Sequence, residues 1–94
     1  MSETGTIELI DTSTTNILGS PYNVIIFNDE NHSMIEVTAQ IIKATHCSAG
    51  RAAQIMHEAH TTGRAICFSG SLERCELCEQ VLAEIHLGTK IEQA

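Results

Sequence analysis

Positively charged residues are scarce in this chain of 94 residues. Five lysines and arginines stand against twelve acidic residues, which gives a formal net charge of −7. So few cations suit neither the phosphates of a nucleic acid nor an anionic membrane surface. We therefore expect no nucleic-acid or membrane partner. The charge suits instead a cationic ligand or a basic patch on a partner protein.

Aromatic residues and long apolar runs are also few. The chain has no tryptophan and only three aromatic residues, so the core must be built from aliphatic, methionine and cysteine side chains. No stretch approaches the roughly 20 apolar residues of a transmembrane helix, and the start of the chain lacks the pattern of a signal peptide. We expect a soluble, intracellular protein whose four cysteines are free thiols or metal ligands rather than disulfides.

Two regions of different composition follow one another along the chain. Residues 1–20 are rich in threonine, serine and glycine, which predicts a flexible N-terminal extension. Residues 21–94 are long enough for one small domain, and a domain of that size is expected to be only marginally stable.

The apolar pattern of residues 21–94 predicts six elements in the order β-α-α-β-α-β. Ser33 and Glu36 form a capping box that should start a helix at Met34. The whole set comprises strands at about 22–28, 65–68 and 87–91, and helices at about 34–45, 49–61 and 72–85. A small sheet covered by helices on one side, an α+β fold, accounts for this order.

Polar residues gather at one strand-to-helix turn. Asn28, Asp29 and Glu30 follow the first strand directly, and such a turn can surround a cation with oxygen acceptors. His60 lies on the second helix with Met56, and Met34 opens the first. Amide, carboxylate, imidazole and methionine together predict a site for a positively charged, partly apolar ligand.

Two other motifs suggest a zinc site. His57-x-x-His60 and Cys75-x-x-Cys78 have spacings that metal sites use. Cys75, Cys78, Leu82 and Ile85 share one helical face, however, which favours packing in the core. A small zinc-binding regulator that uses these cysteines and histidines stays open as an alternative. No nucleophile elbow or glycine-rich phosphate loop indicates an enzyme.

Several of these segments together resemble the ClpS family of adaptors of the ATP-dependent Clp protease. They are Tyr-x-Val-Ile-Ile-Phe-Asn-Asp-Glu from residue 22, Met34, Ala-x-Gln-Ile-Met-x-x-x-His from residue 52 and Gly-Arg-Ala-Ile-Cys from residue 63. The resemblance covers Pro21 to Cys67 closely. It implies a three-stranded antiparallel sheet packed against three helices, and a monomer without cofactor or metal.

The resemblance also implies a function. ClpS proteins are not enzymes: they bind substrate proteins through bulky hydrophobic N-terminal residues, called N-degrons, and deliver them to an AAA+ unfoldase of the ClpA or ClpC type. The expected compartment is the cytoplasm, or the stroma of a plastid in a plant. A docking module that regulates the unfoldase without reading N-termini is a further alternative.

Residue roles follow from the same resemblance. Asn28 and His60, with Asp29 or Glu30, are expected to bind the N-terminal amine, and His32 stands where the family contacts the peptide backbone. Glu73 matches a contact with the unfoldase, although Cys78 replaces a frequent lysine. Glu30 replaces a second aspartate, and Ala59 replaces a larger aliphatic residue. The expected side-chain pocket comprises Ile26, Met34, Val37, Met56, Ala59 and Leu87.

Overall fold

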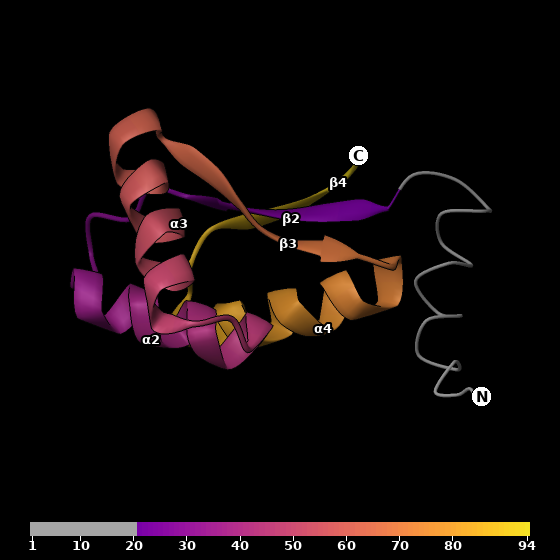
Figure 1. Cartoon of the computed structure of the whole chain (residues 1–94), viewed down its shortest axis with the longest axis horizontal. Helices are drawn as coiled ribbons and strands as arrows, with labels where there is room; N and C mark the ends of the chain where they lie inside the picture. Colours follow the sequence, from indigo (N-terminus) through magenta and orange to yellow (C-terminus); the bar gives the residue numbers. More distant parts are fainter. Residues whose placement is uncertain (1–20) are drawn as a thin grey trace.

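The computed structural model describes residues 21–94, and the predicted flexible extension at residues 1–20 lies outside them (Figure 1). The element order is the predicted one. The elements are β2 (Tyr22–Phe27), α2 (Met34–Thr45), α3 (Ala49–Thr62), β3 (Arg64–Gly70), α4 (Leu72–Leu82), the 3₁₀ turn η1 (Ala83–Ile85) and β4 (Thr89–Gln93).

The strands form one antiparallel sheet in the order β3-β2-β4. Val24, Ile25 and Ile26 of the central strand β2 are all buried, as expected for a continuous apolar run in the middle of a sheet. Figure 1 shows α2 and α4 beneath the sheet, with α3 standing against one end of it. The predicted α+β fold, a three-stranded antiparallel sheet packed against three helices, is confirmed.

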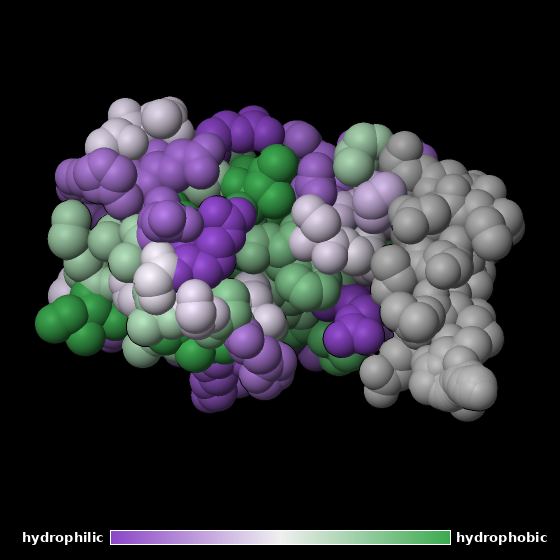
Figure 2. Space-filling model, viewed as in Figure 1, coloured by the Kyte–Doolittle hydropathy of each residue, from purple (hydrophilic) through white to green (hydrophobic). Residues whose placement is uncertain are grey.

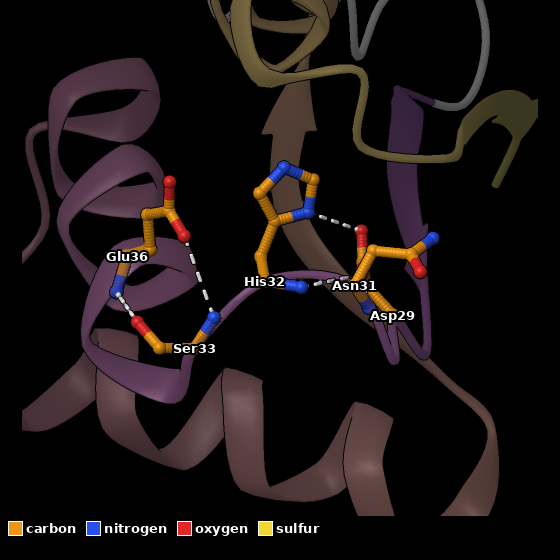
Figure 3. Close-up of polar contacts among 5 residues, drawn as sticks. All are labelled: Asp29, Asn31, His32, Ser33 and Glu36. Atoms are coloured by element: carbon orange, nitrogen blue, oxygen red, sulfur yellow. Dashed lines mark hydrogen bonds and ion pairs between the residues drawn. The ribbon is translucent and has the colours of Figure 1, made fainter.

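Serine caps set the start of each helix. The Ser33 hydroxyl accepts a hydrogen bond from the Glu36 amide at 3.1 Å, and the Glu36 carboxylate accepts one from the Ser33 amide at 3.4 Å. The predicted capping box is therefore present (Figure 3). Ser48 and Ser71 cap α3 and α4 in the same way, through a single side-chain hydrogen bond each. These caps satisfy backbone amides that a helix start leaves without partners.

The core lies between the sheet and the helices. Cys75 and Cys78 are buried on α4 with Leu82, so their predicted packing role is confirmed. These three residues belong to one core cluster, which contains apolar residues of every main element except β4. Ile91 of β4 packs against this cluster. Its other members are Val24, Ile26, Val37, Ile41, Ala52, Ile55, Ala59, Ala65, Cys67 and Leu87.

The end of the chain differs most from the sequence-based prediction. The last helix stops at Leu82 and continues as a 3₁₀ turn that closes at His86, whose φ of 61° is left-handed. The third strand then spans residues 89–93 rather than 87–91, because Ile91 pairs with Val24 of β2. Leu87 lies before the strand and is only 4% exposed, so its apolar side chain belongs to the core.

Candidate functional site

One pocket opens where the end of β2, the loop of residues 28–33, the start of α2 and one face of α3 meet. It encloses about 330 Å³ including its open mouth. Side chains from four separate segments contribute to it. The lining residues are Ile26, Phe27, Asn28, Asp29, His32, Met34, Val37, Met56, Ala59 and His60.

Apolar side chains form the inner walls of this pocket. Ile26, Val37 and Ala59 are buried, because strand alternation turns Ile26 towards the helices and helical spacing turns the other two inward. Met56 is half-buried on α3. Met34 is 51% exposed at the mouth. Flexible methionines beside small and branched aliphatic residues suit an apolar guest of variable shape.

Asn28 supplies an amide at the polar rim. Its side-chain nitrogen donates a hydrogen bond to the Glu30 carboxylate at 2.7 Å, and its backbone amide donates one to the Gly63 carbonyl at 3.0 Å. Among the residues that the structure describes, none donates to the Asn28 side-chain oxygen. Glu30 is exposed and does not line the pocket, so it contacts the site through Asn28.

Asp29 organises the loop from within. Its carboxylate accepts hydrogen bonds from the backbone amides of Asn31 and His32, and from the His32 ring at 2.8 Å (Figure 3). The side chain is 10% exposed. Burial by itself would raise the pKa of Asp29, but these hydrogen bonds outweigh it and hold the pKa below its ordinary value. Asp29 is therefore ionised, and its carboxylate accepts hydrogen bonds from groups of the loop itself.

Two histidines complete the rim. His32 contacts Asp29 through Nδ1, which leaves Nε2 as the ring nitrogen available for another contact. His60 is exposed on α3 and lines the pocket, whereas His57 is exposed on the same helix outside it. An imidazole nitrogen can accept a hydrogen bond in its neutral form.

The structure brings together most of the residues expected at the site. Four of the five expected polar residues line the pocket, namely Asn28, Asp29, His32 and His60. All the expected apolar residues except Leu87 line it as well. Leu87 does not line the pocket, because it packs in the core before β4. Phe27 also lines the pocket, which was not expected from the sequence, because strand alternation turns its ring away from the helices, where Arg64 lies 5.8 Å from the ring centre. Its place at the very end of β2 brings it to the rim.

Glu73 lies elsewhere, in the first turn of α4. It is exposed and lines a separate groove with His46 from the end of α2 and with Leu77 of α4. The expected contact with an unfoldase therefore falls on a different surface from the pocket, which leaves both surfaces accessible at once.

The residues of the zinc alternative do not converge. Cys75 and Cys78 are buried in the core, and His57 and His60 are exposed on α3. Within residues 21–94, no group of three or more histidine, cysteine or acidic side chains is placed to hold a metal ion. A hydrogen bond between Cys67 and Cys78 lowers the pKa of Cys78 and raises that of Cys67, which fits two adjacent thiols in a core.

Among residues 21–94, no helix has the length and apolar character needed to span a membrane.

A family model and a solved structure are both similar to this chain. The family model described as ATP-dependent Clp protease adaptor protein ClpS matches residues 19–88. The structure of Agrobacterium tumefaciens ClpS2 bound to L-phenylalaninamide has a TM-score of 0.74 to this chain, with 18% sequence identity, and the match covers 80% of this chain and 98% of that one. Among curated protein sequences, none matches. At 18% sequence identity, the structural similarity shows the fold alone.

Proposed function

Because this chain belongs to the ClpS family of adaptor proteins of the ATP-dependent Clp protease, we propose that its pocket binds the N-terminal residue of substrate proteins. The first side chain, if bulky and hydrophobic, enters between α2 and α3, and the free amine stays at the polar rim. The observation that carries this proposal is the joint lining of one pocket by Asn28, His60 and buried apolar walls.

The rim suits an α-ammonium group, which is cationic near neutral pH and has three N–H donors. The Asn28 side-chain oxygen and a neutral His60 nitrogen accept two of these hydrogen bonds. Glu30 holds the Asn28 amide in the orientation that presents its oxygen, and its carboxylate adds negative charge nearby. Hydrogen bonds from a charged donor contribute roughly 1.5–3 kcal/mol each. An internal peptide nitrogen offers one neutral donor, so the rim selects chain termini.

We propose different roles for the two acidic residues of the loop, Asp29 and Glu30. From the sequence, either Asp29 or Glu30 could receive the third N–H. Three hydrogen bonds within the loop occupy Asp29, so we assign Glu30, directly or through water, to the ammonium. His32 Nε2 is the atom proposed to contact the peptide backbone.

The apolar walls supply the other part of the affinity. Burying a leucine or phenylalanine side chain contributes about 1.5–3 kcal/mol. The captured substrate would then pass to an unfoldase of the ClpA or ClpC type that contacts the surface around Glu73. We infer a monomeric adaptor without enzymatic activity or cofactor, in the compartment of its Clp protease, whether cytoplasm or plastid stroma.

A pair of peptides tests this function. Fluorescence anisotropy should show binding of a labelled peptide that begins with phenylalanine, and acetylation of its N-terminus should nearly abolish that binding. His60→Ala should weaken binding strongly, and the matched control His57→Ala on the same helix should not. Equal affinity for the free and acetylated peptides would refute the amine site and leave an unfoldase-docking module as the better account.

A further inference from the structure

An apolar stripe runs along α2 from the mouth of the pocket. Ile35, at 82%, is the most exposed of the large hydrophobic residues in the described part of the chain. Figure 2 shows strongly hydrophobic residues on the surface at the α2 end of the molecule. The residues of this α2 stripe line a shallow groove of about 530 Å³, and none is ionisable: Met34, Ile35, Thr38, Ala39 and Ile42.

The α2 stripe and the pocket share one residue. Met34 lines both, so a chain that leaves the pocket over Met34 reaches the stripe without crossing a charged side chain of the groove. From Met34 to Ile42 the helix rises about 12 Å, at roughly 1.5 Å per residue. An extended peptide covers that length in about four residues, at roughly 3.3 Å each.

We propose that the α2 stripe binds apolar side chains at positions 2 to 5 of the same substrate. The protein then reads an apolar N-terminal segment rather than a single N-terminal residue. This inference rests on the proposed function, because the first residue must occupy the pocket for the next ones to reach the stripe.

The chemistry of the α2 stripe defines which segments fit. An uncharged lining favours aliphatic side chains, and it disfavours acidic ones, whose charge would lose water without gaining a partner. A second copy of this chain is a poorer occupant, because each copy carries a formal net charge of −7 and like charges repel. Contiguous exposed apolar surface of this kind commonly marks a binding site.

Two peptides of equal shape provide the test. Both begin with phenylalanine, and positions 2 to 5 are valine in one and threonine in the other, which have similar shape and backbone preference. The wild-type protein should bind the valine peptide about tenfold more tightly, a difference of about 1.4 kcal/mol. Ile35→Ser should reduce that preference to less than about twofold, chiefly by weakening the binding of the valine peptide.

Two further variants make the test specific. Ala39→Glu places a charge in the groove at an exposed position and should also remove the preference. Ile66→Ser is the matched control: Ile66 is exposed on β3, at 45%, and lines neither the pocket nor the stripe, so this variant should keep the preference. Equal affinity of the wild type for both peptides, or an intact preference in Ile35→Ser and Ala39→Glu, would overturn the proposal.

Sedimentation of the protein and acetylation of the peptides distinguish a self-associating stripe from a failure of the amine site. A wild-type dimer that dissociates in Ile35→Ser would overturn the proposal, because the α2 stripe would then be covered by a second copy. If acetylation abolishes binding while the valine and threonine peptides bind equally, the stripe proposal fails and the amine site stands. If the acetylated valine peptide binds as well as the free one, the amine site itself fails.

Discussion

Glu30 offers a sharp test of how the rim is built, because two substitutions separate its two contributions. Its carboxylate accepts a hydrogen bond from the Asn28 amide at 2.7 Å, and its charge lies beside the proposed ammonium. Glu30→Gln keeps an acceptor for Asn28 but removes the charge. Glu30→Ala removes both. The side chain is exposed, so neither change should unfold the protein.

The expected magnitudes follow from these two contributions. A charge interaction between exposed groups is worth about 0.2–1 kcal/mol, so Glu30→Gln should weaken binding of a phenylalanine-starting peptide by up to about fivefold. Loss of the hydrogen bond that orients Asn28 adds about 0.5–1.5 kcal/mol. Glu30→Ala should therefore cost about 0.7–2.5 kcal/mol of binding free energy and weaken binding by roughly 3- to 60-fold in total. The charge contribution should shrink in high salt because mobile ions screen it.

Peptide anisotropy titrations at low and high salt measure both effects. Glu76→Gln, an exposed change on α4 that alters net charge equally, is the control and should bind as the wild type does. Equal affinities of Glu30→Gln and Glu30→Ala would show that Glu30 does not orient Asn28. If both match Glu76→Gln, the account of the rim is refuted.

Three further predictions concern the loop, the mouth and the extension. The pKa of Asp29 is held below its ordinary 3.8 in the folded state, so its stabilising contribution is present above that pH and lost as pH falls through the lower folded value. Chemical unfolding should therefore show that Asp29→Asn costs most near neutral pH and progressively less below about pH 4. Met34→Ala should admit peptides beginning with isoleucine or valine, since it relieves crowding at the β-carbon; equal binding of isoleucine and leucine peptides by the wild type would contradict this. Removing residues 1–15, which are most of the predicted flexible extension at residues 1–20, should leave peptide affinity unchanged but slow degradation of an N-degron substrate by the Clp protease. An unchanged degradation rate would count against a role in delivery.

Local signals made much of the fold predictable from the sequence. The Ser33–Glu36 capping box, Ser48 and Gly63 mark the limits of α2 and α3 through hydrogen bonds and a backbone conformation that depend on a few neighbouring residues. Because these helices start and end within a residue of the predicted limits, helical spacing could show which of their side chains share a face. The assignment of those side chains to a pocket came from the resemblance to the ClpS family.

Long-range geometry was not accessible in the same way. Leu87 stands in a short apolar stretch, and only the pairing of Ile91 with Val24 fixes where β4 begins. The register moves Leu87 out of the strand and into the core. The roles of Asp29 and Glu30 depend similarly on the path of the loop, since adjacent carboxylates are equivalent in sequence until one of them accepts hydrogen bonds from Asn31 and His32.

The end of α3 connects the two acceptors proposed for the ammonium. Gly63 closes the helix with a φ of 97°, a conformation that glycine adopts without steric cost. Its carbonyl accepts the hydrogen bond from the backbone amide of Asn28, only three residues beyond His60. The position of the Asn28 side chain is thus tied to the helix that carries His60. Gly63 itself does not line the pocket, but its turn joins Asn28 to α3, so the fold and the proposed recognition of N-termini depend on the same turn.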